Sequence, residues 1–363
     1  MAQPRIKWTQ ADYKRIKKLR TGGTSWREIA EIFSPTKKAQ LEEHHPRNFV
    51  KRFESEHGEP YERERAGMAT PHEEATTGDI PEPIDIEELK QRRSAEFARK
   101  KANYDAKKLI PVKVNIDGPI GIAHFGDPHI DDPGCDIDLL YKHAKLVRNT
   151  PGLFGGNIGD TTNNWVGRLA ALYANQATTA KEAWALAEDW LKECEWLYMI
   201  AGNHDLWSGA RDPLHWIMKG RSGIHNELQV RMGLSFPNGN KATVHIRHHF
   251  KGNSMWNTAH GPNRAAQMGW RDHILACGHI HTSGYQVVKD PASGIVSHCL
   301  RVAAYKMIDT YAIANNFEDG HIFCCPVTII DPRKSSDSPS FVTTCFDPEE
   351  GADRLTWLRA RKS

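Results

Sequence analysis

Short apolar segments, each followed by Asp, His, Asn or Gly residues, recur through the middle of the chain and alternate with helical segments. The first three lie at residues 120–127, 152–160 and 194–205, and helical patterns at 139–149 and 168–193 separate them. Strands that alternate with helices favour a layered α/β architecture. After about residue 228 strands predominate, and they are predicted at 228–232, 242–250, 273–281, 284–289, 295–300 and 326–330.

The polar residues at the ends of these segments have the chemistry of metal ligands. Ligand sites in open α/β sheets lie outside the carboxyl ends of the strands, so groups at several strand ends can converge. Carboxylate oxygen and imidazole nitrogen suit Mn²⁺, Fe and Zn²⁺, and one carboxylate can bridge two cations. The motifs, in chain order, are Asp127-Pro128-His129, Gly159-Asp160, Gly202-Asn203-His204-Asp205, His248-His249 and Gly278-His279-Ile280-His281.

In this order DPH, GD, GNHD, a strand-end His and GHIH resemble the motifs of calcineurin-like metallophosphoesterases. The likeness spans roughly residues 118–335. It is greatest to phage and prophage members with an N-terminal helix-turn-helix, through Arg247-His248-His249-Phe250 and the stretch GHIHTSGY. The resemblance implies an α/β (α+β) fold, a β-sandwich of two sheets flanked by helices, with metals at the strand ends.

The resemblance also implies a site for two divalent metal ions, with Mn²⁺ expected and Fe or Zn²⁺ as alternatives. His204 would protonate the leaving oxygen or stabilise charge on the phosphate, and Asp205 would orient its imidazole. The implied ligands are Asp127, His129 and His281 for the first metal, Asp160 as the bridge, and Asn203, His248 and His279 for the second.

The ligand at the end of the strand 242–250 has competing candidates. His248 is expected, because it aligns with the histidine of an RHDF-like pattern and shares a strand face with Val244 and Ile246. His249 and His260 lie near the same position and remain alternatives.

Residues beside these motifs are candidates for substrate contact. Asn163, Asn164 and Arg168 follow Asp160 and suit hydrogen bonds to a phosphate or sugar, although a polar loop with a helix cap would use the same residues. Trp207 follows the GNHD motif and suits stacking on a base, with core packing as the alternative.

The N-terminal third differs in composition from the rest. Residues 1–56 hold thirteen Lys or Arg against seven Asp or Glu, and helical patterns at 10–20 and 26–33 flank a Gly-containing turn, as in a helix-turn-helix. Ser34-Pro35 is expected to end the second helix, and a third ends near residue 53. The excess charge predicts contact with DNA phosphates, with Arg47, Lys51 and Arg52 as candidates. A protein-docking or packing module with a solvated basic face is the alternative.

These shifts in composition predict three parts. Residues 1–56 form a basic helical domain, 57–110 a linker and connecting helix, and 111–363 the catalytic domain. In the 363 residues no apolar run reaches the ~18 residues of a membrane span, and no signal peptide is apparent, so no membrane contact and a cytoplasmic location (the host cytoplasm if phage-encoded) are expected. The oligomeric state has no signal in the sequence.

Three functions fit these features. A phosphodiesterase or nuclease that acts on DNA is expected first, since a basic helical unit accompanies a hydrolytic domain. A phosphodiesterase or phosphomonoesterase for small molecules or cyclic nucleotides is the alternative, because one fold hosts many substrates. A DNA-binding adaptor without enzymatic activity is the third.

Overall fold

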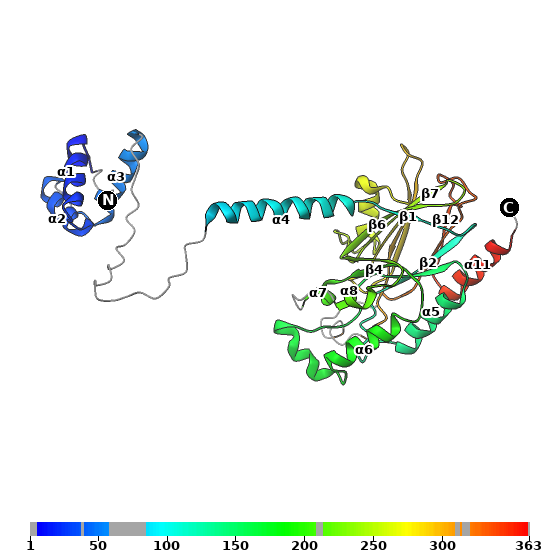
Figure 1. Cartoon of the computed structure of the whole chain (residues 1–363). Coiled ribbons are helices and arrows are strands. Elements are labelled where there is room, and N and C mark those ends of the chain that lie inside the picture. The colour runs from blue at the N-terminus through cyan, green and yellow to red at the C-terminus, as the bar shows by residue number, and fades with distance from the viewer. Residues whose placement is uncertain are drawn as a thin grey trace. The chain divides into compact units, whose positions relative to one another are not determined.

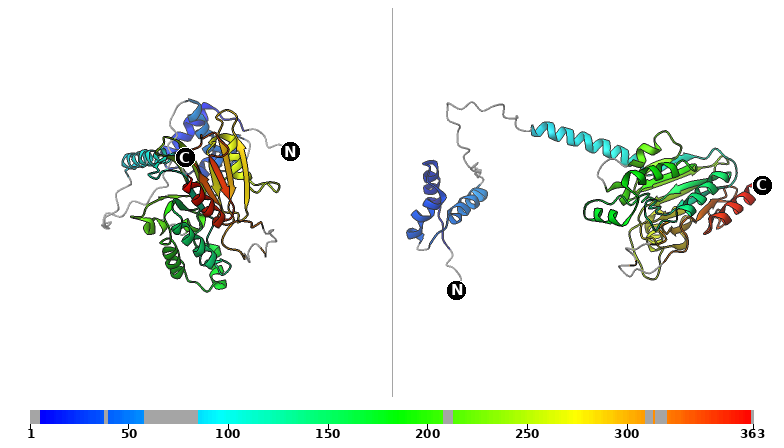
Figure 2. Two further views of the ribbon diagram at one scale, coloured as in Figure 1. Left: turned by 90° about the vertical axis from the view of Figure 1, so that its right-hand side faces the viewer. Right: turned by 90° about the horizontal axis from the view of Figure 1, so that it is seen from below.

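The computed structural model describes residues 6–37, 40–57, 85–207, 213–308, 313 and 320–361. The chain divides into two compact units, residues 1–85 and 86–363 (Figures 1 and 2). Most of the predicted linker between 57 and 85 lies outside the described residues. In the described part of the chain, no helix combines the length and the apolar character that a bilayer crossing requires.

The first unit is a set of three helices around a small apolar core. They are α1 (Gln10–Thr21), α2 (Trp26–Lys37) and α3 (His44–His57), which places helices where the sequence predicts them. Thr9 begins α1 by accepting a hydrogen bond from the backbone N–H of Asp12, whose carboxylate binds Thr9 in return. The core contains Ile16, Ile29, Phe33 and Phe49.

The expectation that Ser34-Pro35 ends α2 is wrong, because the helix continues to Lys37 with Pro35 inside it. Proline removes one backbone donor and crowds the carbonyl four residues earlier, that of Glu31. Glu31 and Pro35 are both exposed, so water can replace the lost hydrogen bond. The hydroxyl of Ser34 donates to the carbonyl of Ala30 at 2.7 Å, which supports the same turn.

The second unit is built on two six-stranded sheets. Sheet A has the order β1 (Ile110–Lys113), β6 (Gln229–Ser235), β7 (Lys241–Arg247), β8 (Ile274–Cys277), β10 (Val296–Arg301) and β9 (Gly284–Lys289). Sheet B has the order β12 (Val342–Cys345), β11 (Val327–Ile330), β2 (Ile120–Phe125), β3 (Leu153–Asn157), β4 (Trp196–Ala201) and β5 (Ile224–Glu227). Both sheets contain parallel and antiparallel pairs.

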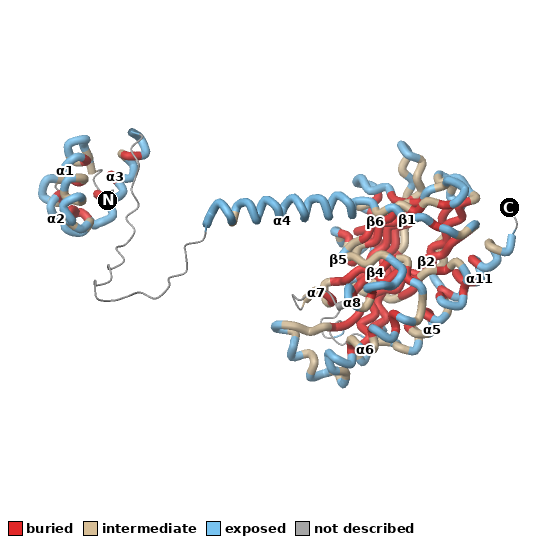
Figure 3. The backbone as a smooth tube through the Cα atoms, in the orientation of Figure 1, coloured by how far each residue is buried: buried red, intermediate tan, exposed pale blue. Residues whose placement is uncertain are grey.

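The main core fills the space between the sheets. Ile122 and Tyr198 of sheet B belong to the same buried cluster as Val244 and Ile274 of sheet A. Figure 3 shows the buried residues concentrated along the strands. The structure thus confirms the predicted mixed α/β class, with two sheets packed face to face.

Helices cover the outer faces of both sheets. A second core joins sheet B to α5 (Ile137–Asn149), α6 (Ala180–Trp190) and α11 (Pro348–Ala360). A smaller cluster joins sheet A to the segment α9 (His260–Ala265) and η2 (Ala266–Trp270). Two short helices, α7 (Asn203–Leu206) and α8 (Pro213–Met218), follow β4, and the long helix α4 (Ile86–Ala106) precedes β1.

The single helix predicted at 168–193 is wrong, because the structure has two helices there. A 3₁₀ helix, η1 (Gly167–Asn175), is followed by a break and then by α6. Thr179 caps α6 together with Glu182. The side chain of Gln176 bonds Asp131 and the carbonyl of Thr178, which stabilises the break.

The strand ends that carry the motifs come together for a topological reason. β2, β3 and β4 are neighbours in sheet B and run parallel, so their carboxyl ends share one edge. β7 and β8 are parallel neighbours in sheet A. Five polar segments that lie far apart in the sequence therefore leave the two sheets at neighbouring places.

Candidate metal centre

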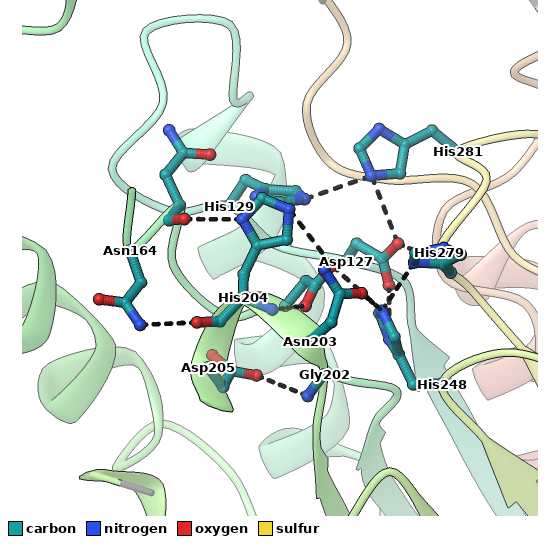
Figure 4. A network of polar contacts seen from close by, with 12 residues as sticks. Asp127, His129, Asn164, Gly202, Asn203, His204, Asp205, His248, His279 and His281 are labelled. Atoms are coloured by element: carbon teal, nitrogen blue, oxygen red, sulfur yellow. Dashed lines mark hydrogen bonds and ion pairs between the residues drawn. The ribbon is translucent and has the colours of Figure 1, made fainter. Parts of the chain in front are cut away.

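The loops after these five strands bring the predicted ligands into one cluster, drawn in Figure 4. Three groups of side chains each present ligand atoms within 4.8 Å of one another. Asp160 and His129 each belong to two of the groups, and of these two residues Asp160 has the pair of oxygens with which a carboxylate can bridge two cations. The groups are Asp127, His129 and His281; His129, Asp160 and His204; and Asp160, His248 and His279.

On one side of the cluster, two imidazoles and a carboxylate face each other. The Nε2 atoms of His129 and His281 lie 3.2 Å apart, and Nε2 of His281 lies 3.4 Å from Oδ2 of Asp127. Asp127 is fully buried, and its Oδ1 has no hydrogen-bond partner among the described residues. A buried carboxylate oxygen without a donor is costly unless a cation compensates it.

On the other side, several ligand atoms surround Nε2 of His248. This nitrogen lies 3.1 Å from Oδ2 of Asp160, 2.9 Å from Oδ1 of Asn203 and 3.1 Å from Nδ1 of His279. A single N–H can be directed at only one of them. Together with the Asp127 oxygen that lacks a hydrogen-bond donor, this convergence of oxygen and nitrogen atoms fits Mn²⁺, Fe or Zn²⁺.

The competing candidates for the fourth motif take different positions. His248 is buried between Asp160 and the carbonyl of Ile158, which lies 3.0 Å from its Nδ1. The ring of His249 packs against that of His279 at 4.9 Å, and His260 begins α9. Neither His249 nor His260 belongs to a candidate metal-binding group of the described residues.

The backbone is strained at this cluster. His129, Asp160, His279 and His281 all have positive φ angles, of 43°, 51°, 73° and 55°. Such conformations are uncommon for residues other than glycine and persist only where the surroundings impose them. They turn the side chains sharply at the strand ends.

One glycine shows how closely the loops approach each other. A Cβ atom at Gly278 would lie 2.3 Å from Oδ1 of Asp127. The backbone N–H of the next residue, His279, donates a hydrogen bond to Oδ2 of Asp127 at 2.6 Å. The absence of a side chain at Gly278 therefore lets the loop after β8 reach the carboxylate after β2.

The electrostatics of the cluster favour added positive charge. Burial raises the pKa of the Asp127 carboxyl to about 6. Burial opposes ionisation of Asp160 too, but the neighbouring His248 holds the pKa of that carboxyl well below its usual range. Burial would lower the pKa of His248, yet Asp160 raises it to about 10. The Asp160 carboxylate thus draws a positive charge into the site.

His204 is held with one ring nitrogen facing the cluster. Its Nδ1 lies 2.6 Å from the carbonyl oxygen of Asn163, and its Nε2 lies 3.9 Å from Oδ2 of Asp160. A carbonyl only accepts hydrogen bonds, so Nδ1 carries a proton and Nε2 is the nitrogen that gains or loses one. Burial lowers the pKa of His204, which favours release of that proton.

Asp205 holds the backbone around the cluster. Its carboxylate accepts hydrogen bonds from the backbone N–H of Thr161 at 3.0 Å and of Gly202 at 2.8 Å. It therefore joins the loop after β3 to the loop after β4. The orientation of the His204 ring, which the sequence assigned to Asp205, is supported in the structure by the carbonyl of Asn163.

Three of the other predicted site residues contact His204, and Arg168 is not among them. Asn163 is buried and donates to Asp132 and Gln176, whereas Asn164 is half-buried and donates to the carbonyl of His204 at 2.6 Å. Trp207 is half-buried, with its ring centroid 3.8 Å from that of His204. Arg168 is exposed on η1.

Sequence reasoning missed several residues that support this loop. Trp165 lies with its ring 5.2 Å from that of His204, and its indole N–H donates to Gln176. Gln176 bonds the buried Asp131, and Lys306 forms an ion pair with Asp132 at 3.0 Å. Asp131 and Asp132 follow the DPH motif after one intervening residue, and this proximity was the available signal. Gln176 and Lys306 lie in no motif.

Known proteins resemble the chain in structure. No protein-family profile and no curated protein matches its sequence. NAD nucleotidase of Haemophilus influenzae is 10% identical to the chain, with a TM-score of 0.36. The match covers 62% of this chain and 49% of the nucleotidase, so the chain spans about half of that protein's length. A predicted phosphoesterase of Streptococcus pneumoniae is 10% identical with a TM-score of 0.29, over 64% of this chain and all of that one. Vacuolar Protein Sorting 29 of Cryptosporidium parvum is 12% identical with a TM-score of 0.34, over 64% of this chain and 98% of that one.

Proposed function

We propose that the unit 86–363 is a calcineurin-like metallophosphoesterase that hydrolyses phosphoesters with two divalent cations. The main support is the position of Asp160, which is fully buried and belongs to two neighbouring groups of ligand atoms. A carboxylate between two such groups is suited to a dinuclear site. One mononuclear site would use only half of the imidazoles gathered here.

The ligands divide around Asp160. Bound divalent cations would neutralise charge on the phosphoryl group and lower the pKa of water. Mn²⁺ is proposed, with Fe or Zn²⁺ as alternatives. The residues that would hold the two ions are Asp127, His129 and His281 on one side, Asn203, His248 and His279 on the other, and Asp160 between them.

His204 is proposed to deliver a proton to the leaving oxygen. Its Nδ1 is engaged by the carbonyl of Asn163, which leaves Nε2 directed toward Asp160 and the substrate side. A general acid needs a fixed orientation and a nitrogen that loses its proton readily. Trp165 and Trp207 enclose the ring and limit its rotation.

The substrate is proposed to be a nucleic-acid phosphodiester. The support is the positive charge of residues 1–56, together with the exposure of Arg47, Lys51 and Arg52 on α3. Cations on a helical unit neutralise backbone phosphates and make binding steeply dependent on salt. A small-molecule phosphodiesterase or phosphomonoesterase is the competing proposal.

A substrate panel combined with Asp160→Asn tests the proposal. We expect the wild-type protein to hydrolyse a phosphoester with Mn²⁺ and to lose this activity with a chelator. Asp160→Asn should reduce turnover by about a hundredfold or more, in the range of lost electrostatic catalysis, and should lower the metal content measured by mass spectrometry. The same change at Asp138, which is exposed on α5, is the control and should have little effect.

The panel also separates the candidate substrates. It contains a bis-aryl phosphodiester, an aryl monoester, a cyclic nucleotide and linear DNA. Preference for DNA supports the nucleic-acid proposal, and preference for the cyclic nucleotide or the monoester supports the alternative. Full metal loading and full activity in Asp160→Asn would refute the bridging role.

A further inference from the structure

Helix α4 is exposed along its whole length. None of its 21 residues is buried, and Leu89 is its half-buried member. A helix without an apolar face in a core gains little from tertiary packing. Ion pairs between its own side chains at spacings of three and four residues support it instead. They join Lys90 to Glu87, Arg93 to Glu96 and Lys101 to Asp105.

The two sides of α4 carry different kinds of side chain. Arg93, Phe97, Lys100 and Tyr104 follow one another at spacings of four, three and four residues, which places them on one side of a helix. Cations and aromatic rings therefore alternate along a single stripe. We name this stripe and its flanks the basic-aromatic face, made up of Lys90, Arg93, Phe97, Lys100, Lys101 and Tyr104.

The opposite side of α4 is different in character. It carries small residues, Ala95, Ala98 and Ala102, at spacings of three and four. Phe97 and Tyr104, on the basic-aromatic face, are 67% and 62% exposed. They are seven residues apart, or about 10 Å along the axis. Two exposed rings between cations on one face are not needed to hold the helix together.

The net positive charge of α4 indicates what kind of partner could bind this face. Between residues 90 and 108 the chain has eight Lys or Arg and two Asp or Glu. Lys100 forms no ion pair with any described residue. Such an excess repels a second copy of the same helix and attracts a polyanion. Aromatic rings beside cations suit a polyanion that has flat bases as well as phosphates.

We propose that the basic-aromatic face of α4 binds a nucleic-acid strand. Lys90, Arg93, Lys100 and Lys101 contact phosphates, and Phe97 and Tyr104 stack on bases. This site is made of different residues from the candidate contacts of α3. This binding does not depend on the proposed phosphodiesterase function.

Fluorescence anisotropy of the full chain with labelled single-stranded and double-stranded oligonucleotides tests the binding. A chelator is present, so that turnover does not interfere. The test variant is Arg93→Gln/Lys100→Gln, and the control is Arg92→Gln/Arg99→Gln. Each control position precedes a test position by one residue and so lies about 100° away around the helix. Glutamine preserves helix propensity, and circular dichroism verifies folding.

The expected result is a selective loss of binding. Arg93→Gln/Lys100→Gln should weaken binding about tenfold at low salt and reduce the slope of log Kd against log salt by about 1.4 to 1.8, the value for two lost phosphate contacts. The control should remain within about twofold. Phe97→Ala/Tyr104→Ala should weaken single-strand binding by about tenfold or more, since base stacking is lost.

Three outcomes would overturn the proposal. Unchanged affinity in Arg93→Gln/Lys100→Gln would show that the basic-aromatic face does not bind the oligonucleotide. Equal losses of affinity in the test and control variants would show that binding depends on net charge and not on a specific face. Binding to phosphatidylserine vesicles, with no binding to oligonucleotides, assigns the face to an anionic membrane surface.

A parallel assay separates this proposal from the proposed function. Turnover of the bis-aryl phosphodiester by the wild-type protein reports on the metal centre without a strand to bind. Oligonucleotide binding without this turnover refutes the phosphoesterase and leaves the binding face intact. Turnover of the bis-aryl phosphodiester without binding that depends on the basic-aromatic face refutes the binding proposal and leaves the proposed phosphoesterase intact.

Discussion

The imidazole of His204 illustrates how single residues set the chemistry of the site. A backbone carbonyl engages its Nδ1, the ring of Trp207 lies against it at 3.8 Å, and its own backbone N–H donates to Oδ1 of Asp160 at 2.9 Å. These contacts restrict both its rotation and its tautomer. Nε2 is left as the ring nitrogen that can gain or lose a proton.

Replacement of His204 should separate proton transfer from metal binding. We expect His204→Ala to retain its metals and to lose about 10²- to 10⁴-fold in kcat on alkyl esters, the usual contribution of a general acid. Esters with a nitrophenol leaving group need less protonation and should lose less. Steady-state kinetics on both esters, with metal analysis, measure this.

The control for this prediction is His215→Ala, at an exposed position of α8. It should leave both activities unchanged. If His204→Ala hydrolyses the alkyl ester at the wild-type rate, His204 has no role as the acid.

At the scale of elements, the loops after the strands depend on close backbone approach. The candidate ligands His129, Asp160 and His279 take left-handed backbone conformations, and the glycine before His279 leaves space for the carboxylate of Asp127. The strands fix where each loop begins. The loop conformations then determine which way the ligands point.

A methyl group at Gly278 should damage the site more than the fold. Its Cβ would lie 2.3 Å from Oδ1 of Asp127, so the carboxylate must move. We expect Gly278→Ala to weaken metal binding about tenfold or more, and overpacking to cost about 1–3 kcal/mol of stability. Isothermal titration calorimetry with Mn²⁺ and thermal unfolding measure the two effects.

The matched control is Gly233→Ala in β6, where the added Cβ would meet Leu109 side-chain atoms at 3.5 Å, an ordinary contact. Its metal affinity should equal that of the wild type. Equal affinity in Gly278→Ala would show that the approach to Asp127 is not required.

At the scale of the whole molecule, the chain combines two units with separate cores. The core of the first unit contains Ile16 and Phe33, and the main core of the second contains Ile122 and Val244. The candidate metal ligands all belong to the second unit. A ligand that binds one folded unit stabilises that unit alone.

Metal should therefore shift one unfolding transition and leave the other in place. At a hundred times its Kd, Mn²⁺ should stabilise the unit 86–363 by about 2.7 kcal/mol per independent site, which corresponds to several degrees in Tm. The transition of the first unit should not move. Differential scanning calorimetry with Mn²⁺ and with chelator measures this, and a metal-dependent shift of the first transition would contradict it.

Much of this architecture was predictable because local patterns determine it. Short apolar runs between polar loops predicted β2, β3, β4 and β6 to β11, and period 3.6 predicted α1 and α5. β1, β5 and β12 were not predicted. The helix 168–193 was predicted as continuous because its apolar spacing continues across the break. Contacts of Gln176 with the distant Asp131 decide where that helix stops.

The sequence by itself determined which residue types end the strands, and hence that oxygen and nitrogen ligands for metal ions are present in a fixed order. Only the tertiary structure decided that His248 faces the cluster, that Asn163 holds the His204 ring and that Asp205 joins two loops. Those outcomes depend on contacts between residues 41 and 44 positions apart, and still farther apart for His248 and Asp160. Such contacts follow from strand order and loop conformation, which no local spacing of residues encodes.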